Sequence, residues 1–196
     1  INTLYILYRV FLFIVNFIYN IKNNFNFFVE TLNENQKKFS KKWKNPFLFS
    51  LYFLFNVPMG WFSGMRIKEI SKKKCITYLP FQWYYRWQNK NPYKSMYFAV
   101  QSMGAELSTA SLATLATKGY SESIALIVTE MSSKYFKKAT GNLTFKCDEG
   151  EKIFKAVDKA VKTKKGVETK VKTVGKMNDG TVVSEFYFTW SFKVRN

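Results

Sequence analysis

The stretch YFAVQSMGAELSTASLATLAT fills residues 97–117 of this chain. Small side chains dominate it: Ala99, Gly104, Ala105, Ser108, Ala110, Ala113 and Ala116. Larger side chains recur at helical spacing: Val100, Met103, Leu107 and Thr114. Ser95 can cap the start of such a helix, and Lys118 and Gly119 can end it. Because small side chains let a sheet approach on several sides, the stretch predicts a central helix rather than a surface helix.

The segments around this helix favour β-strands. Residues 181–194, TVVSEFYFTWSFKV, alternate between large apolar and more polar side chains, and the turn signal Asn178-Asp179-Gly180 precedes them. Further strands are expected at 65–71, at 73–87 with a break at Pro80, in a buried run at 124–131, and at 142–147 and 167–174. Helices are expected at 46–62 and 152–165. No βαβ repetition occurs, so the sequence predicts an α+β fold with an antiparallel sheet.

The N-terminal part differs from the rest of the chain. Residues 1–20 are nearly all apolar or aromatic, with Arg9 as the one charge, and their length is close to that of a membrane span. A membrane anchor, an uncleaved signal-like segment and an artefact all remain open, although no A-x-A-like cleavage site follows. Residues 20–45 are rich in Asn and Lys. We therefore expect an N-terminal segment and linker over 1–44 and one domain over 45–196.

Composition excludes several classes of chemistry. The chain has no histidine, which excludes Ser-His-Asp and Cys-His catalysis and histidine-ligated metals, so no metal site is expected. Cys75 and Cys147 lie far apart in sequence and are expected to be free thiols of a cytoplasmic protein. The net charge of +18 attracts anions such as nucleic acid, anionic lipid or a phosphorylated cofactor, unless it reflects only solvated lysines.

Glu106 is the candidate catalytic residue, because it is the only charged residue between Tyr97 and Thr117. A carboxylate within a wrapped helix is costly unless it is paired or functional, and burial raises its pKa toward the range of a general acid or base. The alternative is that Glu106 lies at a helix edge and pairs with one of the many lysines.

Upstream, Asn89 and Asn91 lie in a loop that runs into the start of the helix. Free backbone N–H groups there, near Phe98 and Ala99, could polarise a carbonyl oxygen, and Asn91 could position water or a thioester. Ordinary turn chemistry also explains both asparagines.

Three motifs together resemble the hot-dog thioesterase superfamily. They are Pro58-x5-Gly64-x2-Ile67, the loop NKNPYKSMY at 89–97, and SMGAE at 102–106. The resemblance covers about residues 45–196 and is closest to a branch known only as a domain of unknown function, similar to the YiiD thioesterase-like domain. It implies a hot-dog fold, in which a curved antiparallel sheet of five or six strands wraps around the central helix.

The resemblance also implies roles for individual residues. A loop Asn, a helix N-terminal amide and a helix carboxylate share the work in that superfamily, which points to Asn91, the Phe98-Ala99 amides and Glu106. Asn89, Ser95 and Tyr97 accompany them on the substrate-binding side. A homodimer with the pocket at the subunit boundary is implied as well. One departure stands out, since better-characterised members carry Gly-Gly where this chain has Phe98-Ala99.

Three functions therefore compete. The first is hydrolysis of acyl-CoA, with CoA as part of the substrate and no separate cofactor, and with Lys and Arg meeting its phosphates. The second is non-catalytic binding of an acyl thioester or lipid on the same fold. The third, nucleic-acid binding, is disfavoured because nine lysines in 152–176 are interrupted by Asp158 and Glu168 rather than forming a stripe. Residues 1–20 are a candidate segment for membrane contact.

Overall fold

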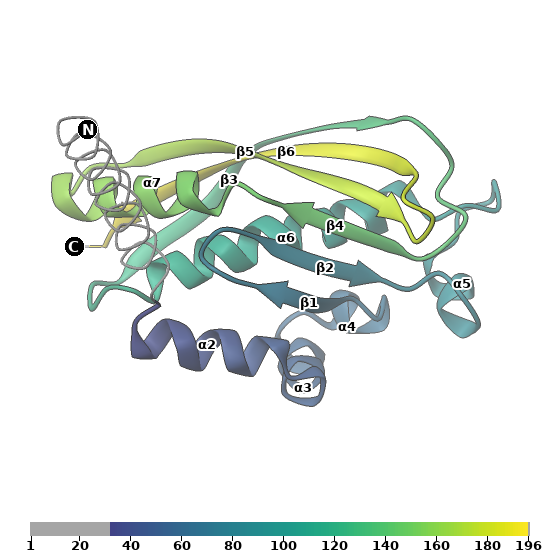
Figure 1. Cartoon of the computed structure of the whole chain (residues 1–196), viewed down its shortest axis with the longest axis horizontal. Helices are drawn as coiled ribbons and strands as arrows, with labels where there is room; N and C mark the ends of the chain where they lie inside the picture. The colour runs from purple at the N-terminus through teal and green to yellow at the C-terminus, as the bar shows by residue number, and fades with distance from the viewer. Residues whose placement is uncertain (1–31, 196) are drawn as a thin grey trace, which may run out of the picture. The chain divides into compact units, whose positions relative to one another are not determined.

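The computed structural model describes residues 32–195, and Asn33–Asn196 form one compact unit. Figure 1 shows a long sheet that curves around one helix. The segment 1–20, interpreted above as an anchor or an artefact, lies outside the described residues. Within them, the fold is the α+β hot-dog arrangement that the sequence predicts.

The sheet has six strands in the order β1-β2-β4-β5-β6-β3, and every neighbouring pair is antiparallel. The bounds are Arg66–Ile70 for β1, Cys75–Leu79 for β2, Ile124–Tyr135 for β3, Leu143–Cys147 for β4, Val167–Met177 for β5 and Val182–Val194 for β6. The predicted hairpin turn at 178–180 joins β5 to β6, with Gly180 at a φ of 84° that suits glycine. Burial alternates along β6, as its sequence pattern requires.

The central helix α6, Phe98–Thr117, packs against β1, β2, β4, β5 and β6. Its small residues explain this close fit. At Gly104, an added Cβ would lie 3.0 Å from the ring of Phe145, and the Gly104 carbonyl accepts a 2.8 Å hydrogen bond from Thr77 Oγ1 on β2. Trp190 Nε1 on β6 donates to Thr109 Oγ1 at 3.1 Å. The wrapped position of the helix therefore confirms the prediction made from residues 97–117.

The bounds of the other described helices are Glu34–Lys44 for α2, Pro46–Asn56 for α3, Pro58–Phe62 for α4, Tyr84–Asn89 for α5 and Gly150–Thr163 for α7. Among them, α7 packs against α6, β5 and β6. Both α2 and α3 contact the edge strand β1. None of the helices within residues 32–195 is long and apolar enough to cross a membrane.

The start of the domain corrects the expected boundary at 44/45. Gln36 Nε2 donates to the Leu115 carbonyl on α6 at 3.2 Å, and Ser40 Oγ donates to the Ile70 carbonyl on β1 at 3.4 Å. Asn33 caps α2 and donates through Nδ2 to the Gly119 carbonyl at 3.0 Å. These bonds make α2 part of the folded unit, although its Lys- and Asn-rich composition suggests a linker.

Three local expectations are wrong. Residues 84–87 of the predicted strand 73–87 belong to helix α5, and the β2 ladder ends before Pro80. The run at 124–131 is largely exposed rather than buried, because β3 is an edge strand that pairs only with β6 among the described strands. Ser95 does not cap α6, whose N-cap is Tyr97 without a side-chain hydrogen bond.

Candidate functional site

Asn91 organises the loop before α6. Its Oδ1 accepts hydrogen bonds from the Tyr93 N–H at 3.0 Å, the Ser95 N–H at 3.1 Å and Ser95 Oγ at 3.2 Å. Its own N–H donates to the Ser95 carbonyl at 2.8 Å. Ser95 is thus committed to the loop rather than to the helix cap. Among residues 32–195, only the Nδ2 donor of the Asn91 side chain remains without a partner, so it is the side-chain group of Asn91 that is free to contact another molecule.

Asn89 is a structural anchor in this geometry. Its buried Nδ2 donates to the carbonyls of Ser63 and Pro80, each at 2.9 Å, and its own carbonyl accepts from the Tyr97 N–H at 2.8 Å. The side chain thus joins the segments after α4 and β2, and the backbone carbonyl joins them to the start of α6. Asn89 Oδ1 is buried without a partner in the described part of the chain. We therefore assign Asn89 to positioning the helix start.

The first turn of α6 presents free backbone donors. The N–H groups of Phe98, Ala99 and Val100 have no intrahelical acceptor, as at any helix start, and no side chain caps them. The Phe98 side chain stands beside them, 55% exposed, with its ring centroid 4.9 Å from that of Tyr97 and 6.5 Å from that of Tyr135 on β3. These amides can stabilise a negatively charged oxygen, provided Phe98 leaves access to them.

Glu106 lies in the middle of α6, on the face that the sheet leaves open. Its side chain is exposed in the single chain, and it has no ion pair or side-chain hydrogen bond among the described residues. Protein packed around the carboxyl still withdraws enough water that desolvation raises its pKa above the ordinary glutamate value. The exposure of the side chain and its raised pKa are compatible because one side of the carboxyl faces solvent and the other faces the domain. The alternative was that Glu106 lies at a helix edge and pairs with a lysine. No lysine pairs with Glu106 among the described residues.

The sequence matches the family described as Domain of unknown function (DUF4442) over residues 46–192. The chain belongs to this family. No sequence among the curated proteins matches the chain.

Solved structures support the fold of this DUF4442 chain. PA5026 of Pseudomonas aeruginosa, a protein of unknown function described as a probable thioesterase, is 18% identical with a TM-score of 0.61, covering 75% of this chain and 95% of its own. A protein of unknown function from Chlorobaculum tepidum is 14% identical with a TM-score of 0.64, covering 85% and 99%. PaaI of E. coli, from the phenylacetic acid degradation operon, is 10% identical with a TM-score of 0.52, covering 81% and 96%. These likenesses establish a thioesterase-like hot-dog fold.

The candidate residues of the DUF4442 domain fall into two groups. Asn89, Asn91, Ser95 and the Phe98-Ala99 amides meet at the start of α6, whereas Glu106 lies eight residues further on. That interval is about 12 Å along a helix axis. No hydrogen bond joins Glu106 to Asn91 within residues 32–195. A reacting carbonyl must lie about 3 Å from both the oxyanion donors and the attacking water, so a site within one chain would have to span this interval along α6.

Other reactive groups in the described chain are poorly suited to catalysis. Cys75 and Cys147 are free and lie directly opposite each other on β2 and β4, a proximity that their sequence separation hides. Burial raises the pKa of both thiols, that of Cys147 to about 12, so neither provides a thiolate near neutral pH. No cluster of three or more metal-ligating side chains occurs within residues 32–195.

Sequence reasoning missed a hollow and an aromatic neighbour. The hollow, of about 380 Å³, lies between α3, α4, β1 and α5 and is lined largely by aromatic side chains together with Arg66 and Gln88. It contains none of the candidate catalytic residues. Tyr135 was also missed, although its ring contacts those of Phe98 and Phe186 beside the start of α6. The aromatic richness of 46–62 and 81–87 was the available signal for the hollow.

Proposed function

We propose that this DUF4442 protein hydrolyses acyl thioesters such as acyl-CoA, as a homodimer in which each active site uses both chains. The observation that carries the proposal is Glu106. It is an unpaired carboxylate with a raised pKa on the central helix, and the same helix begins with uncapped backbone donors. The thioesterase-like fold of its structural neighbours supports the same class of reaction.

Glu106 acts as the general base in this proposal. It removes a proton from water, and the water oxygen attacks the thioester carbonyl carbon. The N–H groups of Phe98 and Ala99 stabilise the oxyanion that forms. When the C–S bond breaks, the thiolate of CoA receives the proton from Glu106, and the carboxylic acid is released. The excess of Lys and Arg provides partners for the phosphates of CoA.

The second copy docks along β3. This edge strand of 12 residues has no partner on its outer side among the described strands, and Ile127 and Met131 are exposed on it. Long open edges of this kind pair readily with another strand. Pairing there would let Asn91 and the α6 amides of one copy meet Glu106 of the other, which removes the 12 Å gap within one chain.

A hydrolysis screen over acyl-CoA chain lengths tests the activity directly. Hydrolysis is measured as the release of the free thiol of CoA. Glu106→Gln keeps the shape of the side chain and removes the base. Asn91→Asp keeps the Oδ1 acceptor that holds the loop and removes the Nδ2 donor, whereas Asn91→Ala removes both. Loss of turnover in both Asn91 variants assigns the role to Nδ2. If Asn91→Asp retains turnover and Asn91→Ala loses it, the role of Asn91 is to hold the loop through Oδ1.

Mixing tests the shared site. Glu106→Gln and Asn91→Asp chains should each be impaired alone, yet a mixed dimer contains one site with both native residues. Random reassociation of equal amounts should restore about a quarter of wild-type turnover, because half the dimers are mixed and each has one intact site. No recovery from mixtures shown to exchange subunits contradicts a site built from two chains.

Non-catalytic binding of an acyl thioester is the second candidate, and Phe98 is the observation that favours it. Its large side chain stands beside the amides where better-characterised members have glycine. If Phe98 crowds the oxyanion site, Phe98→Gly should raise turnover. A wild-type protein that binds acyl-CoA but never hydrolyses it, with or without Phe98→Gly, establishes the binder.

A further inference from the structure

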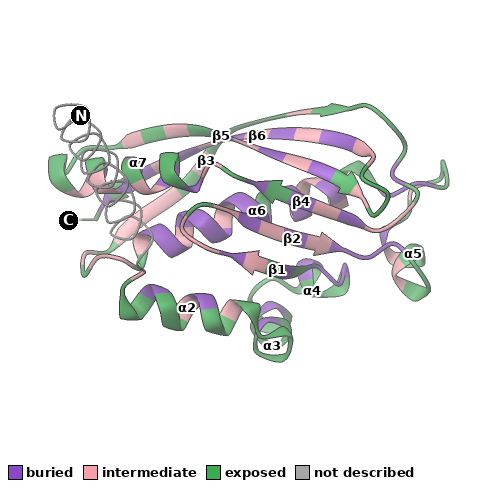
Figure 2. Ribbon diagram, in the orientation of Figure 1, coloured by how far each residue is buried: buried purple, intermediate pink, exposed green. Residues whose placement is uncertain are grey.

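An apolar surface covers α3, α4 and α5. Thirteen of the twenty large hydrophobic side chains that are exposed in the described part of the chain lie between residues 47 and 87. Phe47 is 72% exposed, Phe55 76% and Trp83 85%. Figure 2 shows the exposed residues along α3 and α5, in contrast to the buried α6. Monomeric proteins rarely expose so many large apolar groups together unless the surface binds something.

The surface is built from well-anchored helices. Asn45 Oδ1 caps α3 by accepting from the Phe47 and Leu48 N–H groups, and Pro46 begins the helix. Only two side chains of α3, Phe49 and Phe53, are buried. Trp61 Nε1 donates to Ser50 Oγ at 3.0 Å, which ties α4 to α3. The outward side chains of α3 are therefore displayed by a fixed helix rather than by a loose segment.

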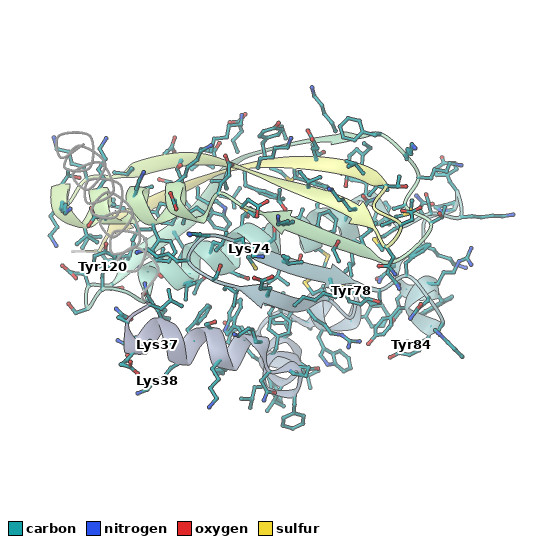
Figure 3. All side chains as sticks on the ribbon, in the orientation of Figure 1. Lys37, Lys38, Lys74, Tyr78, Tyr84 and Tyr120 are labelled. Carbon is teal, nitrogen blue, oxygen red and sulfur yellow. The ribbon has the colours of Figure 1, made fainter. Side chains whose placement is uncertain are left out.

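Positive charge is concentrated on the same part of the chain. Between Glu34 and Glu106 there are 13 basic residues and one acidic residue, Glu69, which pairs with Lys74. From 107 to 195 the balance is 16 basic to nine acidic. The 13 basic residues are Lys37, Lys38, Lys41, Lys42, Lys44, Arg66, Lys68, Lys72, Lys73, Lys74, Arg86, Lys90 and Lys94. Figure 3 shows Lys37 and Lys38 on the outer side of α2 and Tyr84 on α5.

Six of these cations border the apolar surface. Lys44, Arg66 and Lys68 line one hollow together with Pro46, and Arg86, Lys90 and Lys94 line another beside Trp87. None of the six has an acidic partner among residues 32–195. We call α3, α4, residues 83–87 and these six cations the aromatic-basic surface.

We propose that the aromatic-basic surface binds the surface of an anionic lipid bilayer. Tryptophan and tyrosine beside lysine and arginine, with phenylalanine, leucine and methionine between them, are typical of helices that lie in the interface of a bilayer. The cations would meet lipid phosphates while the apolar side chains lie below the headgroups. At 11 residues, α3 is too short to cross a bilayer but long enough to lie in its interface. This proposal does not depend on thioester hydrolysis.

Charge favours a lipid over the other occupants. A second copy would bring the same excess of cations against this surface, which opposes association. A nucleic acid would match the charge and the aromatic rings, but it leaves the exposed Leu, Val and Met side chains without an apolar partner.

Vesicle flotation of the full chain tests the proposal. We expect binding to vesicles of phosphatidylcholine with phosphatidylglycerol, much weaker binding to phosphatidylcholine alone, and weakening by salt. Phe47→Ser with Phe55→Ser and Met59→Ser should weaken binding at least about tenfold by removing apolar contact. Lys44→Gln with Arg66→Gln and Lys68→Gln should weaken it roughly 10- to 100-fold.

The matched control removes the same charge elsewhere. Lys155, Lys159 and Lys165 are exposed on or just after α7, without ion pairs in the described chain, and their joint change to Gln should alter binding less than about threefold. Circular dichroism of each variant checks folding. All variants retain residues 1–31, so any vesicle contact through that segment is common to them.

Three results would overturn the proposal. They are absence of binding to anionic vesicles, equal binding by the wild type and both surface variants, and equal weakening by the α7 control. Tighter binding to duplex DNA than to vesicles, unaffected by the Phe47, Phe55 and Met59 changes, would assign the surface to nucleic acid instead.

Discussion

Two apolar helices of the described chain, α6 and α3, have opposite environments. The central helix α6 is wrapped by the sheet, and nine of its 20 residues are Gly, Ala or Ser. Helix α3, PFLFSLYFLFN, is richer in large apolar side chains, yet it lies outside and buries only Phe49 and Phe53. Hydrophobicity alone therefore does not decide which helix becomes the core. Side-chain size decides it, because a sheet curling closely around a helix leaves no room for large residues on every face.

The difference extends to polar groups. On α6, Ser108 Oγ donates to Thr173 Oγ1 at 2.8 Å, and Gln101 Oε1 accepts from Ser184 Oγ at 3.1 Å, both buried. On α3, Ser50 accepts its bond from Trp61 at the surface. The polar residues of α6 thus fix its position against the sheet. The outer face of α3 has no described partner within its own chain.

The largest effect should come from the one carboxylate of α6. Glu106→Gln should lower kcat for acyl-CoA roughly 10²–10⁴-fold, the range for a positioned general base. The Phe47 and Phe55 changes on α3 and the Met59 change on α4 should leave kcat on a short, water-soluble acyl-CoA unchanged. Steady-state kinetics of both variants distinguishes the contribution of α6 to turnover from that of the outer helices. A Glu106→Gln enzyme as active as the wild type would show that Glu106 is not the general base.

The next largest effect should come from placing a larger side chain where α6 packs closely against the sheet. Gly104→Leu places its side chain against Phe145 and should lower the free energy of unfolding by about 3 kcal/mol or more. Gly166→Leu is the control, because no atom lies within 4 Å of its added Cβ. Urea titration gives both values. Similar losses at the two glycines would mean that the sheet does not constrain α6 as closely as described.

The pH dependence of turnover sharpens the role of Glu106. Desolvation raises its pKa, and only the ionised form accepts a proton from water. Therefore kcat/KM should fall about tenfold per pH unit below the raised pKa. The contribution of Glu106 to stability changes with pH in the opposite direction to its contribution to turnover. Between the unfolded and folded pKa values the folded chain binds more protons, so the free energy of unfolding decreases as pH rises. Glu106→Gln should remove the Glu106 contribution to both pH profiles, and comparing rate and urea midpoint across pH in wild type and variant tests this.

Serine replacements compare the two environments directly. Ser108→Ala leaves the buried Thr173 hydroxyl without its partner and should cost about 1–2 kcal/mol of unfolding free energy. Ser50→Ala removes an exposed hydrogen bond and should cost less than about 0.5 kcal/mol. Equal urea midpoints for the two variants would contradict the contrast between the helices.

The smallest effect is expected at the exposed side chains of α3 and α4. Phe47→Ser, Phe55→Ser and Met59→Ser should each change the free energy of unfolding by less than about 0.5 kcal/mol, because the native side chains are mostly exposed. Phe53→Ser is the contrasting change, since its buried ring packs on Phe49 at 4.1 Å and should cost several-fold more. A large loss at Phe47 or Phe55 would show that the outer face of α3 contributes to the fold itself.

The sequence by itself determined the central helix, the β5-β6 hairpin and the overall α+β class. Each depends on local information: small residues from 97 to 117, a turn triplet ending in Gly180, and strict alternation along 182–194. It also singled out Glu106 as an isolated charge. These features could be predicted because periodicity and turn chemistry act over a few neighbouring residues.

Only the tertiary structure decided the remaining features. An apolar run such as 124–131 is read as buried until the sheet order makes it an edge, and α2 resembles a linker until Gln36 and Ser40 meet carbonyls far away in sequence. The separation of Glu106 from Asn91, the structural role of Asn89 and the exposure of α3 likewise depend on long-range packing. Local patterns contain no information about which distant segments occupy each face, and these faces determine where the candidate site and the aromatic-basic surface lie.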